Sequence, residues 1–495
     1  MKQNKFNKNK MIALILIIAL IFVLFVATIV VHFNKYDGLS LSLLIKDLRW
    51  VFLAFVILLP ILVFLLIRSS LDNGNTDLVD AEYFGVNFEN EYKKKKPLKI
   101  IDEKYRNKGI VNVDPNSLVT ESSTSKKKSK KEAQGGESRF YMLTGIDKAY
   151  ENYEAPEFDN EISLKELCEN FRNYSSNKLK LYYDIQDIRR FIGGLAVTKL
   201  IILQGMSGTG KTSLAYAFGE FLDNKTTVVP IQPMWKERTD LIGYYNEFTR
   251  KFNETTLLYK MYEANNNKEI YITVLDEMNI ARVEYYFAEF LSLLEIPNPD
   301  GRNLDVVADK WDNDPKLLNK GKLRLPTNMW FIGTANNDDS TFSISDKVYD
   351  RAMVLNLDKK AIPFEAPAIE PMKLSSDHLE QLFKKAQREY ALSDRNLRRI
   401  KKLDEYMIQT FHLTFGNRIM KQIHAYVPVL VACGGSELEA LDDILSRKVF
   451  RKLESKNPVY VKQMSESLCT YLDDLFGIDK MPLCKEAVRL IEQNI

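Results

Sequence analysis

The stretch Gly205-Met-Ser-Gly-Thr-Gly-Lys-Thr212 decides the fold of this chain. It fits the phosphate-loop pattern G-x-x-x-x-G-K-[ST]. The apolar run 199–203 leads into it and predicts a buried strand, and the run 213–219 leaves it and predicts the start of a helix. Glycines in such a loop let backbone N–H groups point at phosphate oxygens, and the helix N-terminus adds a positive dipole end. A chance glycine-rich turn is the alternative, which the flanking patterns disfavour.

Two side chains of this loop have predicted roles of their own. Lys211 is expected to reach the β- and γ-phosphates of a nucleotide, and the Thr212 hydroxyl is expected to bind Mg²⁺. The residues expected to hold the nucleotide are Gly205, Met206, Ser207, Gly208, Thr209, Gly210, Lys211, Thr212 and Ser213.

A second motif is the apolar run Tyr271-Ile-Thr-Val-Leu, which ends in Asp276 and Glu277. In a nucleoside triphosphatase, Asp276 would bind the Mg²⁺ shell and Glu277 would polarise the attacking water. An ordinary strand that ends in acidic residues is the alternative. The phosphate loop upstream favours the catalytic interpretation.

A third apolar run, 329–335, ends at Asn336 and Asn337. An amide at this position would orient water beside Glu277 without adding charge, and Asn336 suits that role better than Asn337. Asparagine at the end of a strand is common, so this run carries little weight alone.

Together these motifs make the chain similar to AAA+ ATPases, in the branch of McrB-like restriction motors, MoxR-like ATPases and dynein-related modules. The resemblance covers about residues 180–495. It implies an α/β fold, with a parallel-sheet nucleotide-binding domain and a helical lid, in a ring-forming motor. The residues that carry it are Gln204–Thr212, Gln232–Trp235, Asp240–Asn246, Leu275–Glu284 and Gly333–Asn336.

The resemblance also implies roles for two arginines. Arg351 stands where the family places the arginine finger, which enters the neighbouring subunit's site, although relatives often carry several arginines there. Arg418 resembles the lid arginine called sensor 2, which contacts the γ-phosphate of its own subunit; a surface arginine is the alternative. Arg282 has no acidic neighbour three or four residues away, and it is left open between a subunit contact and a solvated side chain.

Composition fits one motor with an anchor. The chain has 495 residues and a net charge of +3, so no whole-chain basic field argues for nucleic acid. The four cysteines form no C-x-x-C pair, which favours reduced thiols and no zinc site. Residues 11–32 and 50–67 are apolar and long enough to be two transmembrane helices. A signal peptide or buried core helices are the alternatives to these spans.

The distribution of basic residues predicts a multi-pass protein of the cell membrane with its ATPase domain in the cytoplasm. Lys35, Lys46 and Arg49 lie between the spans and weaken that bias. The predicted organisation is a membrane anchor (1–69), a charged flexible linker (70–140), a connecting segment (141–180), the nucleotide-binding domain (181–360) and the helical lid with a C-terminal bundle (361–495). The lysine-rich part of the linker is solvated, or it contacts anionic lipid or nucleic acid.

Three further segments and one residue carry structural expectations. Residues 181–198 and 283–294 are expected to be helices, the second one under the sheet, and 243–256 a hairpin. Trp235 either faces a central channel, where an aromatic ring grips a polymer, or packs locally. The polar insertion 296–327 is left without a role.

These features lead to one functional hypothesis with two alternatives. The first is a membrane-anchored NTPase ring, hexameric, with Mg²⁺ and with ATP preferred over GTP, which remodels or translocates a polymer or a separately encoded partner, in a McrB-like defence setting. The alternatives are a MoxR-like chaperone for a membrane or envelope complex, and a slow nucleotide-gated scaffold. The sequence shows no nuclease, protease or zinc pattern, and it leaves contact with nucleic acid open.

Overall fold

A computed structural model describes residues 138–336, 341–358 and 361–493, all within one compact unit. The two predicted transmembrane segments and almost all of the predicted linker lie outside these residues. Within the described ranges, no helix has the length and apolar character needed to cross a membrane.

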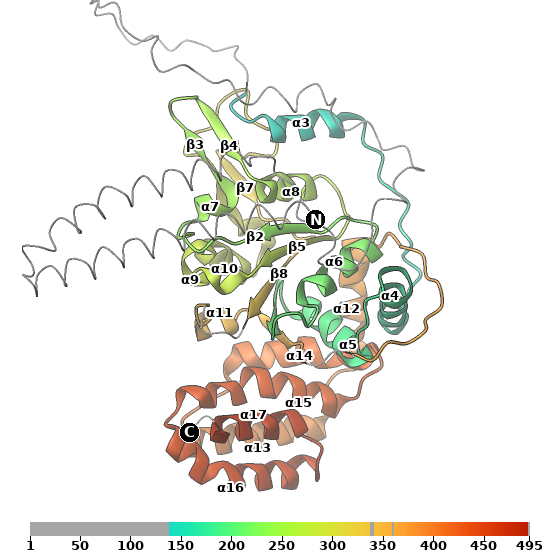
Figure 1. Cartoon of the computed structure of the whole chain (residues 1–495), viewed down its shortest axis with the longest axis vertical. Coiled ribbons are helices and arrows are strands. Elements are labelled where there is room, and N and C mark those ends of the chain that lie inside the picture. Colours follow the sequence, from blue (N-terminus) through green and yellow to red (C-terminus); the bar gives the residue numbers. More distant parts are fainter. Residues whose placement is uncertain (1–137, 337–340, 359–360, 494–495) are drawn as a thin grey trace, which may run out of the picture. The chain divides into compact units, whose positions relative to one another are not determined.

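A parallel sheet forms the centre of the nucleotide-binding region, in the strand order β2-β5-β8-β1-β9, and every neighbouring pair runs parallel (Figure 1). The strands are β1 (Leu200–Gly205), β2 (Thr227–Pro230), β5 (Tyr271–Asp276), β8 (Met329–Asn336) and β9 (Met353–Asn356). All three motif strands pair side by side, with Leu275 opposite Gly333 and Gly205 opposite Asn336. The predicted α/β architecture with a parallel sheet is thereby confirmed.

Helices cover both faces of the sheet, because alternate residues of each buried strand point to opposite sides. In β1, Ile201 and Leu203 face one apolar core, whereas Leu200 and Ile202 face the other. The first core includes α4 (Leu164–Leu179), α5 (Ile185–Val197) and α6 (Lys211–Phe221). The second includes α8 (Thr256–Ala264), α9 (Val283–Tyr286) and α10 (Ala288–Glu295), so the domain has three layers.

Two helices differ from their predicted bounds. α5 begins at Ile185, four residues later than expected, because the Asp184 side chain accepts a hydrogen bond from Gln186 N at 2.8 Å and caps the helix there. The helix expected over 283–294 is broken at Phe287, whose ring is buried and stacks on Phe290 at 4.8 Å between centroids. Both rings pack against Phe331 of β8, so the expected position under the sheet is confirmed.

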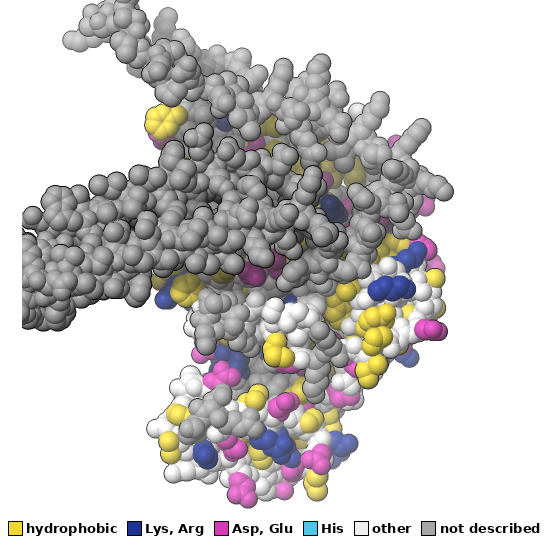
Figure 2. All heavy atoms as spheres, in the orientation of Figure 1, with side chains coloured by type: hydrophobic (Ala, Val, Ile, Leu, Met, Phe, Trp, Pro, Cys, Tyr) yellow, Lys and Arg dark blue, Asp and Glu magenta, His cyan; other side chains and the backbone are white. Residues whose placement is uncertain are grey.

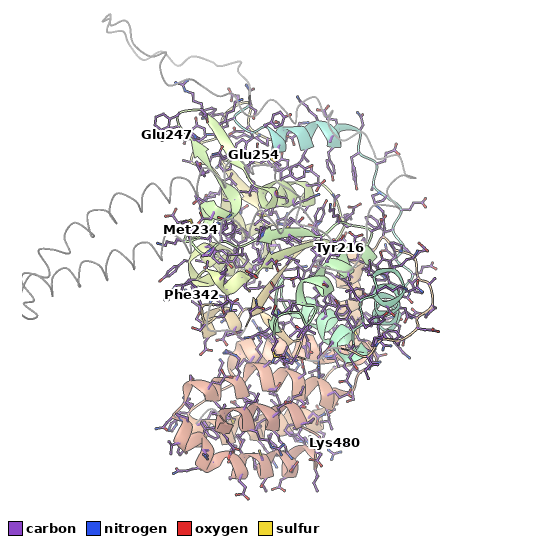
Figure 3. The ribbon with its side chains drawn as sticks, viewed as in Figure 1. Tyr216, Met234, Glu247, Glu254, Phe342 and Lys480 are labelled. Atoms are coloured by element: carbon purple, nitrogen blue, oxygen red, sulfur yellow. The ribbon has the colours of Figure 1, made fainter. Side chains whose placement is uncertain are left out.

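The expected hairpin follows the short helix α7 (Arg238–Ile242) and consists of β3 (Gly243–Asn246) and β4 (Lys251–Glu254). The Glu254 carboxylate accepts hydrogen bonds from the first N–H groups of α3 (Met142–Ala149), next to the hairpin in Figure 3. α3 continues into the 3₁₀ helix η3 (Tyr150–Asn152). The connecting segment is therefore fixed to the base of the hairpin.

The insertion 296–327 packs against the same hairpin, which gives it a structural role. It contains η5 (Pro299–Gly301) and the antiparallel strands β6 (Asn303–Asp305) and β7 (Lys322–Arg324). Trp311 of the insertion contacts the ring of Tyr245 and also the guanidinium of Arg139, which lies 4.2 Å from the Trp311 ring centroid. Arg139 is buried and pairs with Asp314 at 2.7 Å. One buried cation thus joins the insertion to the last residues of the predicted linker, just before the connecting segment.

The C-terminal part is helical, as predicted. Its elements are α12 (Ser376–Glu389), α13 (Asp394–Phe411), α14 (Gly416–Ala432), α15 (Glu437–Lys448), η6 (Phe450–Ser455), α16 (Pro458–Phe476) and α17 (Pro482–Gln493). Serine side chains cap α12, α13 and α15 by accepting a backbone hydrogen bond in the first turn. On the face shown in Figure 2, acidic and basic side chains are interspersed over this region.

Candidate nucleotide-binding site

The phosphate loop lies between β1 and α6, as the sequence predicts. Gly210 has φ of +90° and precedes the first residue of α6, in a backbone region that favours glycine. Gly205 has φ of +146°, and a Cβ there would lie 2.6 Å from the carbonyl oxygen of Leu357. The loop between them is exposed at Met206, Ser207 and Gly208, so a ligand can reach its backbone.

The side chain of Lys211 curls back over this loop. Its Nζ donates to the carbonyl oxygens of Gly205 at 3.0 Å and Met206 at 2.7 Å. The residue is 7% exposed, so its ammonium is held at the mouth of the loop rather than in solvent. This position is suited to an anionic ligand bound by the loop.

A chain of hydrogen bonds joins the ends of three elements next to the loop. The Thr212 hydroxyl donates to Asp276 Oδ1 at 2.9 Å, and the Thr334 hydroxyl donates to the same oxygen at 2.8 Å. Thr334 Oγ1 in turn accepts from the backbone N of Glu277 at 2.8 Å. The residues predicted to hold Mg²⁺ are thus in direct contact, and both are oxygen donors of the kind that Mg²⁺ prefers.

Glu277 follows β5 in an unusual backbone conformation. Its φ of 52° and ψ of 45° are left-handed, which is uncommon for a residue with a side chain and is typical of functional positions. The Glu277 side chain is exposed, while its backbone is fixed by Thr334 and by the 3₁₀ helix η4 (Met278–Ile280) that starts after it. The carboxylate is therefore presented to solvent from a fixed backbone.

Asn336 ends β8, next to the strand that carries Asp276. Its backbone is held by Asn279 of η4, whose Nδ2 donates to Asn336 O at 2.9 Å and whose Oδ1 accepts from Asn336 N at 3.3 Å. Asn279 also donates to Thr341 Oγ1 at 3.0 Å. Since the carboxyl ends of parallel strands form the ligand-binding edge of such sheets, Asn336 and Glu277 lie on the same edge.

Residues 200–352 match the AAA domain of the dynein-related subfamily. This region is an AAA+ ATPase domain. No curated protein matches the chain significantly. Domains of this kind bind nucleotide, typically with Mg²⁺, and generally hydrolyse nucleoside triphosphates. The exposed loop, the Lys211 ammonium and the Thr212–Asp276 oxygen pair fit such a ligand.

A cavity of about 1370 Å³ extends from this edge of the AAA+ domain toward the C-terminal helices. Gln204 and Asn336 line it from the sheet, and Arg447 and Arg451 line it from α15 and η6. Its lining includes no residue of the phosphate loop 205–213, so the cavity lies beside the loop. The guanidinium of Arg447 is fixed by the buried carboxylate of Asp443 at 2.7 Å, so the helical wall of the cavity is rigidly charged.

The two arginines that the family resemblance singles out meet at one carboxylate. Arg351 Nη2 lies 2.7 Å from Glu295 Oε2 at the end of α10, and Arg418 of α14 pairs with the other oxygen of Glu295. The Arg351 side chain is 16% exposed and that of Arg418 is 49% exposed. In this structure Arg418 is therefore paired beside Arg351, and both the finger role of Arg351 and the contact of Arg418 with the γ-phosphate stay predictions.

Two other predicted surface residues are also placed. Trp235 packs locally, with its ring 6.0 Å from that of the buried Tyr286, so the alternative to a channel-facing role is the one that the structure shows. The neighbouring Met234 is 77% exposed and lies at the surface in Figure 3. The unassigned Arg282 is exposed, with its guanidinium 5.0 Å from the centroid of the Phe342 ring.

Three site residues were not predicted from the sequence. Thr334 bridges the two acidic residues, Asn279 fixes the end of β8, and Glu295 holds both arginines. Thr334 had a usable signal, since it stands two residues before Asn336 and alternate residues of a strand share one face. Asn279 and Glu295 had none, because their partners are distant in sequence.

Proposed function

We propose that the chain is a ring-forming, Mg²⁺-dependent ATPase that is anchored in a membrane and works on a partner molecule. The observation that carries the catalytic part is the hydrogen-bond chain from Thr212 through Asp276 and Thr334 to Glu277. It joins a candidate Mg²⁺ ligand to a candidate general base at the sheet edge beside the phosphate loop. Hydrolysis by the purified full-length chain, measured with ATP and with GTP, tests this part and the preference for ATP.

The chemistry follows from the residues at that edge. Lys211 and the loop N–H groups bind the phosphate oxygens, and Mg²⁺ held by Thr212 and Asp276 supplies further positive charge there. Glu277 accepts a proton as the water oxygen attacks the γ-phosphorus, and the bond to the bridging oxygen breaks to leave a diphosphate. Asn336 orients that water without adding charge. Thr334 keeps the Asp276 and Glu277 positions fixed relative to each other.

A second subunit completes the site in this proposal. AAA+ proteins commonly form oligomeric rings, and we propose a hexamer. Arg351 would leave Glu295 and place its guanidinium against the γ-phosphate bound by the neighbour, where charge develops in the transition state. Arg418 would keep Glu295 paired during that movement, because it already binds the carboxylate through the other oxygen. Its family role at the γ-phosphate of its own subunit is the alternative.

The partner is proposed to be encoded separately. The leading setting is McrB-like defence, and a MoxR-like chaperone is the second candidate. Crosslinking followed by purification of the full-length protein separates them. A bound nuclease supports the first, and a bound metal-binding adhesion-type protein supports the second. An assembled ring with very slow turnover would indicate a nucleotide-gated scaffold instead. Bound nucleic acid in the same sample would show that a polymer is engaged.

The membrane anchor rests on the apolar segments 11–32 and 50–67. A reporter that is active only outside the cytoplasm tests it. The reporter should be active when fused near Asp37, and silent when fused at Ile100 or at Ile495. The reverse pattern would separate the AAA+ domain from its nucleotide and would overturn the proposed orientation.

A further inference from the structure

The segment that carries Arg351 is held by cations of the C-terminal helices. It comprises α11 (Asp346–Tyr349) and the three residues that follow, and it lies between the sheet and α14 in Figure 1. Lys448, the last residue of α15, is buried, and its Nζ donates to the carbonyl oxygen of Tyr349 at 2.7 Å and to that of Ala352. These two carbonyls flank Arg351, so one ammonium fixes the backbone on both sides of it.

Further contacts come from the same helical region. Gln422 of α14 donates to the carbonyl oxygen of Asp350 at 3.0 Å, and Lys452 of η6 lies 3.1 Å from the Asp350 carboxylate. Arg451 lies 2.6 Å from the Asp346 carboxylate, and its guanidinium stacks over the Tyr349 ring at 4.0 Å from the centroid. The segment is thus held through backbone, carboxylate and ring at once.

Tyr349 also links the segment to the subunit's own nucleotide site. Its hydroxyl accepts a hydrogen bond from Nε2 of Gln204 at 3.0 Å, and Gln204 is the residue before the phosphate loop. The side chain of Thr198, just before β1, donates to the carbonyl oxygen of Arg351 at 2.9 Å. The AAA+ core and the C-terminal helices therefore hold the segment from opposite sides.

A buried lysine is an expensive way to achieve packing alone, because an apolar side chain of similar size avoids the cost of desolvating the amino group. Lys448 instead fixes a backbone conformation. The carbonyl oxygens of Tyr349 and Ala352 can both accept from one nitrogen only when the backbone between them is folded so that the two oxygens converge. The direction in which the Arg351 side chain leaves that backbone follows from this shape.

We propose that the C-terminal helices position Arg351 for the neighbouring subunit's site, with Lys448 as the main positioning residue. This inference rests on the proposed function, because it requires that Arg351 acts across a subunit boundary. Lys448 contacts no nucleotide in this proposal. It acts on the site next door through the backbone that bears the finger.

The first test compares Lys448→Met with Lys421→Met, which removes an exposed lysine from α14 of the same helical region. Lys448→Met should keep ATP affinity and ring assembly while kcat falls by roughly ten- to a hundredfold, the cost of a slightly misplaced catalytic group. Lys421→Met should match the wild type. Loss of ATP affinity at an unchanged kcat would overturn the proposal.

The second test mixes inactive or weakened subunits, and it distinguishes action on the neighbour from action within the subunit. Lys448→Met mixed with Glu277→Gln should recover activity, because some sites combine an intact Glu277 with a finger from a subunit whose Lys448 is intact. Lys448→Met mixed with Arg351→Ala should not recover, since neither subunit offers a well-placed finger. The opposite pattern would show that Lys448 serves its own subunit's site and would overturn the proposal.

Two controls separate failure of this inference from failure of the proposed function. A mixture of Arg351→Ala and Glu277→Gln that shows no recovery, in rings shown to be mixed, rejects the finger itself and the positioning role with it. If Lys448→Met does not fold, Gln422→Leu removes another contact to the same segment and enters the same mixtures. If Gln422→Leu recovers activity when mixed with Glu277→Gln but not when mixed with Arg351→Ala, the proposal is supported. Recovery in the mixture with Arg351→Ala rejects it.

Discussion

The phosphate-loop edge and the finger segment, residues 346–352 around the proposed finger Arg351, are held in contrasting ways. At the loop edge, the hydroxyls of Thr212 and Thr334 both donate hydrogen bonds to Asp276 Oδ1, at the ends of elements within the AAA+ core. The finger segment is held mainly by side chains from helices almost a hundred residues away in sequence, with Lys448 at the centre. The first arrangement is local to the sheet, and the second depends on how the C-terminal helices pack.

This difference bears on how the two halves of one composite site would be controlled. Residues fixed by strand register keep their geometry as long as the sheet is folded. In the proposed ring, a finger that is fixed by the C-terminal helices would move whenever those helices shift. We therefore expect substitutions at the loop edge to affect the subunit that carries them, and substitutions around the finger segment to affect its neighbour.

The largest effect is expected for Arg351→Ala. A finger of this kind is worth about 10³- to 10⁵-fold in kcat, because it stabilises charge that appears mainly in the transition state. Nucleotide affinity of the monomer should change little. Arg398→Ala, at an exposed position of α13, is the matched control and should retain full activity. Steady-state ATPase assays and nucleotide titrations measure both quantities, and a normal kcat for Arg351→Ala would reject the finger.

Glu277→Gln should lower kcat by about 10²- to 10⁴-fold while nucleotide binding with Mg²⁺ is kept, because the amide preserves shape and removes the base. Lys211→Ala should instead lose binding, since its ammonium lies at the mouth of the phosphate loop. Binding assays and single-turnover hydrolysis separate the two variants. Wild-type hydrolysis by Glu277→Gln would show that another group activates the water.

Thr334→Val tests the hydrogen-bond chain with a smaller change. Valine has the shape of threonine, but it can neither donate to Asp276 nor accept from the Glu277 backbone. The unpaired backbone N–H should lower the free energy of unfolding by about 1–3 kcal/mol, and kcat should fall by about tenfold. Thr334→Ser keeps the hydroxyl and should stay near the wild type in denaturant titrations and ATPase assays. Equal stability and equal kcat for Thr334→Val and Thr334→Ser would show that the Thr334 hydroxyl has no role in the site.

A further effect concerns stability as a function of pH. Burial lowers the pKa of Lys448 from its usual 10.5 to about 7, opposed by the nearby Asp350 carboxylate and reinforced by Arg451, Lys452 and Arg418. Between pH 7 and 9 the unfolded chain then binds more protons at this lysine than the folded chain does, so folded stability rises with pH over that window. In thermal unfolding experiments, the stability of the wild type relative to that of Lys448→Met should increase as pH rises. Parallel curves for the two proteins would contradict the lowered pKa.

The same two regions mark what a single sequence can predict. The strands that end at Gly205, Asp276 and Asn336 could be predicted, because each is a local apolar run that leads directly into a motif. Strand alternation places Thr334 on the same face as Asn336, but its contacts with Asp276 and Glu277 depend on the pairing of β5 with β8, which no local pattern gives. The contacts of Lys448 and Glu295 depend on the packing of helices far apart in the chain, and their types alone suggest solvent-exposed charges.

Side-chain packing between elements explains the remaining differences between the predictions and the structure. The break at Phe287 follows from a ring that packs into the core, although the apolar run 283–294 favours one continuous helix. The local sequence does not decide between the two surroundings of Trp235, because its partner Tyr286 is about fifty residues away. Residues that belong to a short sequence motif were thus predictable. Residues whose role depends on a partner far away in the sequence were not.

The central claim is that each site combines Glu277 of one subunit with Arg351 of the next. Mixing Arg351→Ala with Glu277→Gln in equal amounts tests it most directly, under conditions where mixed rings are shown to form. Random assembly leaves about a quarter of the subunit boundaries with both groups intact, so activity should return toward that fraction of the wild type although each protein alone is inactive. Mixed rings that stay inactive would contradict the claim, because an arginine acting within its own subunit gives no site with both groups.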